Sequence, residues 1–137
     1  MHVTYDKEHN ILTAVRLIKT AVEKYNPKLV VLPENFNTWW GRNDYIRNAE
    51  IIPTGETVTA LINLAKTLKI YIVGGSIAER DIKNKDIFYN TTVVLSPTGQ
   101  LIAKYRKVNE TAKNNVLSSL KHIWFFFRFI LLTLKLG

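Results

Sequence analysis

The sequence contains no cysteine among its 137 residues. This absence excludes disulfides, thiolate metal sites and a cysteine nucleophile within the chain. The N-terminus lacks the basic-then-apolar pattern of a secretory leader, so we expect a cytoplasmic protein. Gly74 and Gly75 lack the spacing of a phosphate loop or a dinucleotide fingerprint, so the sequence does not indicate a nucleotide site.

Acidic residues are few compared with basic ones, 11 against 19, which gives a net charge of +8. The basic residues are scattered along the chain, whereas a nucleic-acid interface needs a clustered patch. We therefore expect no nucleic-acid partner and attribute most of the excess charge to solvated surface. A length of 137 residues leaves room for one domain.

Hydrophobic periodicity predicts an α/β domain. Apolar residues recur at steps of three and four over residues 6–25, with Asp6 as N-cap, and over residues 56–68, which predicts two helices. Apolar runs at 29–32 and 70–73 predict buried parallel strands, and residues 88–95 and 100–105 flank a turn and predict a hairpin. Residues 37–48 read as a loop whose aromatic side chains either line a pocket or pack beneath it. Because a helix on a parallel sheet usually follows a strand, we expect the chain to begin one strand late.

Glu34 is the first candidate for chemistry. It follows the segment LVVLP, residues 29–33, just past the carboxyl end of a predicted strand. Ligands of open α/β sheets bind at such strand ends, and a carboxylate there can act as a general base. The alternative is a structural acid that caps a loop or pairs with a surface lysine.

The second candidate is the basic cluster KYRK, residues 104–107. Taken alone, it reads as a charged edge strand, because lysines on an edge oppose pairing with other chains. The interpretation of this cluster changes when the other segments of the chain are considered together with it.

These segments together resemble the nitrilase superfamily, the carbon–nitrogen hydrolases. LVVLPE at 29–34 is similar to the family's glutamate motif, and KYRKV at 104–108 is similar to its lysine motif. Further similar segments follow the family's order and spacing: IPTGE at 52–56, IVGGSI at 72–77, YNT at 89–91 and SPTG at 96–99. The similarity covers about residues 6–108. The nearest match is the omega-amidase branch, which hydrolyses the side-chain amide of 2-oxo acids such as 2-oxoglutaramate.

The resemblance implies a four-layer α-β-β-α sandwich built from two halves, of which this chain carries about the first half. It implies that Glu34 is the general base that takes the proton of a cysteine thiol, and that Lys107 stabilises the oxyanion. It also implies a small-molecule amide substrate, no cofactor and no metal. Members of the family commonly form dimers, so a homo-oligomer is implied as well.

The chain departs from the family pattern after Val108. The family's nucleophilic cysteine has no counterpart in the sequence, so we expect this chain alone to be inactive as an amidase. We divide it into a partial carbon–nitrogen hydrolase domain, residues 1–108, and a divergent aromatic and apolar tail, residues 109–137. The alternative function is a catalytically dead half-domain that binds full-length homologues, or a peripheral membrane module.

The tail allows three interpretations. Arg128 lies midway through its richest apolar run and opposes insertion into a bilayer, so we do not expect a membrane span. A second interpretation is an amphipathic helix that lies on a membrane or on a partner. The abrupt change of composition favours the third, a segment that did not evolve with this domain, such as a truncated or aberrantly spliced end.

Overall fold

The computed structural model describes residues 1–39 and 41–107. In chain order its elements are α1 (Lys7–Tyr25), β1 (Leu29–Val31), α2 (Arg42–Asn48), α3 (Glu56–Leu68), β2 (Tyr71–Val73), β3 (Ile77–Arg80), β4 (Phe88–Leu95) and β5 (Leu101–Lys107). The predicted tail, residues 109–137, lies outside the described residues.

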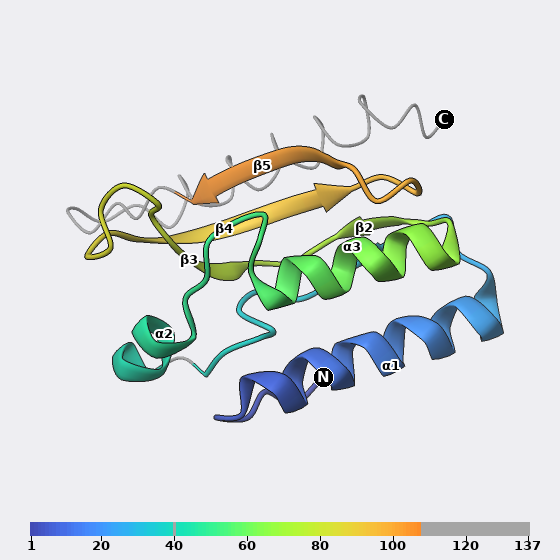
Figure 1. Cartoon of the computed structure of the whole chain (residues 1–137). Coiled ribbons are helices and arrows are strands. Elements are labelled where there is room, and N and C mark those ends of the chain that lie inside the picture. Colours follow the sequence, from blue (N-terminus) through green and yellow to red (C-terminus); the bar gives the residue numbers. More distant parts are fainter. Residues whose placement is uncertain (40, 108–137) are drawn as a thin grey trace, which may run out of the picture.

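One sheet and one layer of helices make up this part of the chain (Figure 1). β1 pairs with β2 in parallel, whereas β2 and β3 both pair with β4 in the antiparallel direction. β5 pairs with the other side of β4. The helices α1 and α3 lie on one face of the sheet (Figure 1). The α/β prediction is confirmed, and the two layers correspond to two of the four that the resemblance implies.

The hydrophobic core lies between this face of the sheet and the two helices. Apolar side chains at helical spacing in α1 and α3 meet alternate side chains of the strands, as the two periodicities require. The core contains Ala14, Ile18, Val58, Leu61, Leu64, Ala65, Ile72, Ile77, Val93 and Leu95. Burial of a large apolar side chain contributes about 1.5 to 3 kcal/mol, so this layer holds the sheet and helices together.

Both long helices begin and end close to the predicted residues. The carboxylate of Asp6 accepts a hydrogen bond of 3.0 Å from the backbone N–H of His9, which confirms the predicted N-cap of α1. Asn26 adopts a left-handed conformation at the C-terminus, directly before Pro27. These ends follow from local capping rules.

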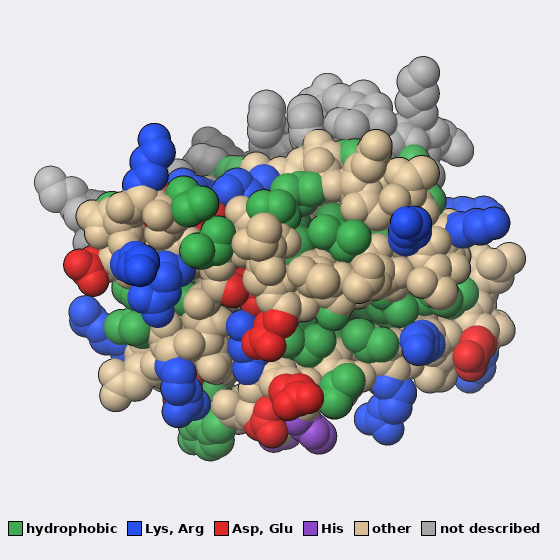
Figure 2. All heavy atoms as spheres, viewed as in Figure 1, with side chains coloured by type: hydrophobic (Ala, Val, Ile, Leu, Met, Phe, Trp, Pro, Cys, Tyr) green, Lys and Arg blue, Asp and Glu red, His purple; other side chains and the backbone are tan. Residues whose placement is uncertain are grey.

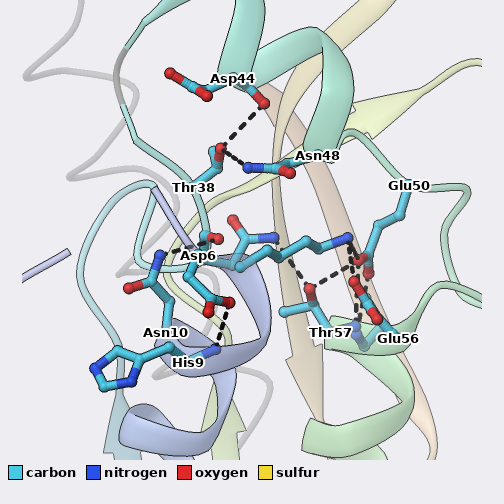
Figure 3. A network of polar contacts seen from close by, with 12 residues as sticks. Asp6, His9, Asn10, Thr38, Asp44, Asn48, Glu50, Glu56 and Thr57 are labelled. Atoms are coloured by element: carbon cyan, nitrogen blue, oxygen red, sulfur yellow. Dashed lines mark hydrogen bonds and ion pairs between the residues drawn. The ribbon is translucent and has the colours of Figure 1, made fainter. Parts of the chain in front are cut away.

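The start of α3 is capped from a distance, because its N-cap residue, Gly55, has no side chain. The buried carboxylate of Glu50 accepts hydrogen bonds from the backbone N–H groups of Thr57 at 3.2 Å and Val58 at 3.1 Å. Lys7 lies 2.8 Å from the same carboxylate and neutralises it. Figure 3 shows Glu50 and Thr57 together at the first turn of α3.

Some local predictions are wrong. The segment predicted as a loop, residues 37–48, contains the helix α2. Its sequence lacks an apolar stripe, and contacts with the sheet hold it: Tyr45 donates to the carbonyl of Tyr89, and Arg80 donates to the carbonyl of Ile46, both at 2.8 Å. The strand β3 was not predicted, because its polar end looks like loop sequence.

The strand β1 is parallel to β2, as predicted, but it is not covered on both faces. It lies at one edge of the described sheet, and Val31 is 46% exposed. The continuous apolar run at 29–32 therefore predicted more burial than β1 has.

The surface view shows how charge is distributed on the helix-covered side. Lys and Arg side chains are spread over this face instead of forming one patch (Figure 2). Within residues 1–39 and 41–107, none of the helices has the length and apolar character that crossing a membrane requires.

Candidate active site

Glu34 and Lys107 lie 73 positions apart in the sequence and meet at one end of the sheet. Lys107 is the last residue of β5, and the antiparallel register places it opposite Asn90 of β4. The Nζ of Lys107 donates to Oε1 of Glu34 at 3.0 Å, and the Nδ2 of Asn90 donates to the same oxygen at 2.8 Å. The structure thus brings together the two residues that the sequence singled out.

The second carboxylate oxygen of Glu34 is in a different situation. Within residues 1–39 and 41–107, no hydrogen-bond donor reaches Oε2. The Glu34 side chain is 42% exposed and that of Lys107 is 39% exposed. Oε1 is therefore occupied by two donors, while Oε2 can accept a proton from an incoming group.

A tight backbone contact holds the loop that carries Glu34. The backbone N–H of Asn35 donates to the hydroxyl of Ser76 at 3.0 Å, and Asn35 itself has a positive φ of 49°. Gly75 has a φ of 55°, and a Cβ there would lie 2.0 Å from the carbonyl oxygen of Pro33. Glycine is therefore required at position 75, because any side chain there would collide with this carbonyl.

The basic cluster of β5 is divided between the two faces of the sheet. Because side chains alternate along a strand, Lys104 and Arg106 point to one face and Lys107 to the other. Lys104 and both nitrogens of the Arg106 fork reach the buried carboxylate of Glu79 at 2.8 to 3.0 Å. Because Lys104 and Arg106 are two positions apart and Lys107 follows directly, the order of residues in KYRK could have predicted that they lie on different faces.

Glu79 is the acid on the other face, and its side chain is 2% exposed. Burial raises the pKa of Glu79, but hydrogen bonds from Arg106, Thr91 and Lys104 outweigh burial and hold the pKa below its ordinary value. The same contact with Glu79 raises the pKa of Arg106. The guanidinium of Arg106 also stacks 3.8 Å above the ring of Tyr89. β5 is thereby fixed against β3 and β4.

An open pocket of about 520 Å³ adjoins Glu34 and Lys107. Its lining combines charged, amide and aromatic side chains: Glu34, Asn35, Arg42, Tyr45, Ile46, Asp86, Phe88, Asn90 and Lys107. Desolvation, with the nearby charges of Glu34 and Glu79, raises the pKa of Tyr45 to about 12, so this wall carries a neutral hydroxyl. Sequence reasoning placed Asn90 in the family-like segment at 89–91 but missed it as a partner of Glu34, since nothing in that segment indicates the contact.

The aromatic residues of the segment 37–48 serve both of the purposes considered for them. Tyr45 lines the pocket, whereas the ring of Trp39 packs 5.0 Å from the ring of Tyr5. Trp40 lies outside the described residues. The basic edge-strand interpretation also holds in part, because β5 lies at an edge of the described sheet.

This arrangement offers a carboxylate with one uncommitted oxygen, next to a fixed ammonium group. Such a pair can accept a proton from a nucleophile and stabilise negative charge that develops nearby. Among the residues that the structure describes, no group of three or more potential ligands could hold a metal ion.

Comparisons with known proteins identify relatives of the chain. The model of the carbon-nitrogen hydrolase family matches residues 1–124. Omega-amidase NIT2-B of Xenopus laevis is 42% identical over 103 residues, which cover 75% of this chain and 36% of the relative. Omega-amidase NIT2 of Homo sapiens is 38% identical over 109 residues, which cover 80% of this chain and 38% of the relative. The chain thus spans little more than a third of the length of these relatives.

Solved structures agree with this assignment. Saccharomyces cerevisiae Nit3, a member of branch 10 of the nitrilase superfamily, superposes with a TM-score of 0.71 at 35% identity, over 82% of this chain and 45% of that one. The C. elegans NitFhit protein superposes with a TM-score of 0.70 at 25% identity, over 84% of this chain and 28% of that one. The chain belongs to the carbon–nitrogen hydrolase family.

Proposed function

We propose that residues 1–108 carry the base and the oxyanion-stabilising lysine of an omega-amidase-like site that hydrolyses small carboxylate-bearing amides, such as amides of 2-oxo acids. The observation that carries the proposal is the contact of 3.0 Å between Lys107 and Glu34 beside an open pocket. Relatives about 40% identical to the chain that are named omega-amidases support the substrate class.

In the proposed reaction, Glu34 accepts the proton of a thiol through its uncommitted oxygen. The thiolate attacks the amide carbon, and the ammonium of Lys107 stabilises the negative oxygen of the tetrahedral intermediate. Collapse releases ammonia, with a proton returned from Glu34, and leaves a thioester. Glu34 then removes a proton from water, whose oxygen attacks the thioester carbon. The C–S bond breaks, the carboxylic acid product leaves, and Glu34 returns the proton to the thiolate.

The 137 residues contain no thiol, so the nucleophile has to come from outside this sequence. On this proposal, the chain by itself releases no ammonia from an amide. The absence of cysteine also supports a second candidate, a catalytically dead half-domain that associates with full-length homologues. Residues 109–137 then form a divergent tail, which a peripheral membrane module would use as its anchor.

Two measurements test the proposal. Purified chain and its Glu34→Gln variant are incubated with 2-oxoglutaramate, and equal ammonia release from both is expected. Release that only the unaltered chain shows would contradict the predicted inactivity and require an unknown nucleophile.

The second measurement tests amide recognition directly. Butyramide is titrated into the chain, and the amide resonances of Asn90 and Lys107 are followed by NMR. We expect shifts that saturate and that weaken in Glu34→Gln. Shifts identical in both proteins, or no shifts, would show that the pocket does not recognise amides.

We also propose a cytoplasmic location, a role in nitrogen metabolism through ammonia release, and a homo-oligomer like those of the family. Cell fractionation tests the first, and light scattering of the purified chain tests the last. A monomer across a wide concentration range would exclude the homo-oligomer.

A further inference from the structure

The outer face of the sheet, opposite α1 and α3, carries a row of apolar side chains. Strand register pairs Val31 of β1 with Val73 of β2, Val73 with Val94 of β4, and Val94 with Ala103 of β5. Directly paired residues point to the same face of a sheet, so these four side chains lie side by side. We call them the outer row, and they make this face apolar across β1, β2, β4 and β5.

The middle of the outer row is buried, although no helix within residues 1–39 and 41–107 lies over it. Val73 is 3% exposed and Val94 is 1% exposed. The helices α1 and α3 lie on the opposite face, and α2 lies at one end of the sheet (Figure 1). In the part of the chain that the structure describes, the apolar neighbours of both valines come from the sheet itself. Burial this complete is typical of a sheet face with a further layer packed on it.

The chain leaves the sheet beside the outer row. Lys107 ends β5, four positions after Ala103, and residues 108–137 follow it. The seven residues of β5 extend over about 24 Å. A helix over residues 117–134 would be about 27 Å long, and residues 108–116 are enough for a connection that reverses the chain. The segment therefore has the length that covering this face requires.

The sequence of this segment carries an apolar stripe. Large apolar residues recur at steps of three and four: Leu117, Leu120, Trp124, Phe127, Leu131 and Leu134. Lys121, Arg128 and Lys135 recur at steps of seven beside this stripe. In a helix, such spacing gives one continuous apolar side with cations along its border, where they reach water. Neither proline nor glycine interrupts residues 108–136.

We propose that residues 117–134 form a helix that packs its apolar stripe on the outer row of the same chain. The inference gives the amphipathic helix considered for the tail a partner, which is the sheet itself. It holds whether or not the tail evolved with the domain, because burial requires only an apolar stripe of matching length. It goes beyond the proposed function and depends on none of its steps.

Tethering favours the chain's own tail over a second copy of the chain. A segment joined to the end of β5 by a short connection meets the outer row at a local concentration on the order of millimolar. A separate molecule at micromolar concentration competes poorly with it. A bilayer is also a weaker competitor, since Arg128 opposes insertion.

The cysteine-free chain permits a direct test with one spin label. A nitroxide is attached to Val31→Cys at the exposed end of the outer row, and the indole N–H of Trp124 is followed by NMR in the full chain. The row spans about 14 Å from β1 to β5, so the label lies close to any helix packed on it. We expect the Trp124 signal, assigned with Trp124→Phe, to lose most of its intensity relative to the reduced label.

The matched control carries the same label at Leu12→Cys, an exposed position of α1 on the other side of the sheet. This label should leave the Trp124 signal at full intensity. Equal effects of the two labels, or no effect of the label at Val31→Cys, would overturn the inference.

Two further samples identify what occupies the face. Spin-labelled chain without ¹⁵N, mixed with ¹⁵N chain without the label, reports only contacts between molecules, and we expect no loss of the Trp124 signal. Added phosphatidylserine vesicles should leave the loss within one chain unchanged. A loss in the mixed sample would assign the face to the tail of a second copy, and recovery on vesicles would assign the tail to a membrane. Either result would overturn the proposal.

Thiol protection provides an independent measurement. Val94→Cys places a single thiol in the middle of the outer row, and its rate of modification by a maleimide is measured in two backgrounds. Phe127→Ser removes a side chain of the stripe and should accelerate modification about tenfold, because a large apolar contact is lost. Phe125→Ser lies outside the stripe and should change the rate by less than about twofold. Equal rates in the two backgrounds would contradict the proposal.

Discussion

Replacing Glu79 by glutamine tests a buried carboxylate on which four donor contacts converge. The carboxylate is 2% exposed and accepts hydrogen bonds from Arg106 at 2.8 and 2.9 Å, from Lys104 at 3.0 Å and from the Thr91 hydroxyl at 2.5 Å. The variant keeps the shape of the side chain but places an NH₂ group, itself a donor, where donors already converge. At least one of these groups then loses its acceptor.

The magnitude follows from the exposure of the partners. A hydrogen bond to a charged group contributes about 1.5 to 3 kcal/mol, which would sum to a large loss. The side chains of Arg106 and Lys104 are 36% and 34% exposed, however, so water can compensate them in part. We expect Glu79→Gln to lower the free energy of unfolding by about 2 to 3 kcal/mol near neutral pH.

The pH dependence of the stability loss in Glu79→Gln distinguishes an effect of the lost charge from an effect of the changed side-chain shape. Burial raises the pKa of Glu79, but the hydrogen bonds from Arg106, Thr91 and Lys104 hold this pKa below its ordinary value in the folded chain, so its contribution to stability is present above that ordinary value. It is lost as the pH falls through the folded-state pKa, because the folded chain then takes up the proton. The stability difference between the chain and Glu79→Gln should therefore shrink on acidification.

Urea unfolding followed by circular dichroism, near neutral pH and at about pH 3, measures this difference. Glu23→Gln removes an exposed acid of α1 and should change stability by less than about 0.5 kcal/mol. A Glu79→Gln effect as small as this control would refute the reasoning. An effect of the same size at both pH values would show that the lost charge is not its cause.

Three further predictions concern single contacts. Gly55→Ala should destabilise the chain by about 2 kcal/mol in urea unfolding, because the new Cβ would lie 2.4 Å from the Glu50 carboxyl carbon that caps α3; an unchanged stability would show that Glu50 moves freely. Asp6→Ala should cost about 1 kcal/mol and reduce hydrogen-exchange protection only in the first turn of α1. Tyr45→Phe should cost about 1 kcal/mol. Because burial raises the Tyr45 pKa to about 12, this loss should hold below about pH 10 and fade as the pH rises through 12, and a constant loss would contradict it.

The helices and the hairpin could be predicted because their signals are local. The N-cap at Asp6 and the stripe over residues 6–25 lie within one segment, and so does the turn before β5, where Gly99 has a φ of 78°. The helix α2 could not be predicted in this way. Its sequence has no apolar stripe, and its support comes from β3 and β4, which lie far along the chain.

The candidate site likewise contains residues that the sequence predicted and residues that it did not. The motif resemblance pointed to Glu34 and Lys107, but nothing near either residue indicated Asn90, which reaches the same carboxylate oxygen. The pocket lining was also beyond local reasoning, because α2, the loop after β1, and strands β4 and β5 all contribute to it.

The sequence alone thus determined the order of α1, β1, α3, β2, β4 and β5, the absence of a thiol, and the alternation that separates Lys107 from Lys104 and Arg106. Periodicity and composition carry this information, because they depend on neighbours within a few positions. Only the tertiary structure decided that Glu34 and Lys107 meet at 3.0 Å and that Glu79 collects the other two cations. Strand pairing sets these contacts, since one shift in register would send each side chain of β5 to the opposite face.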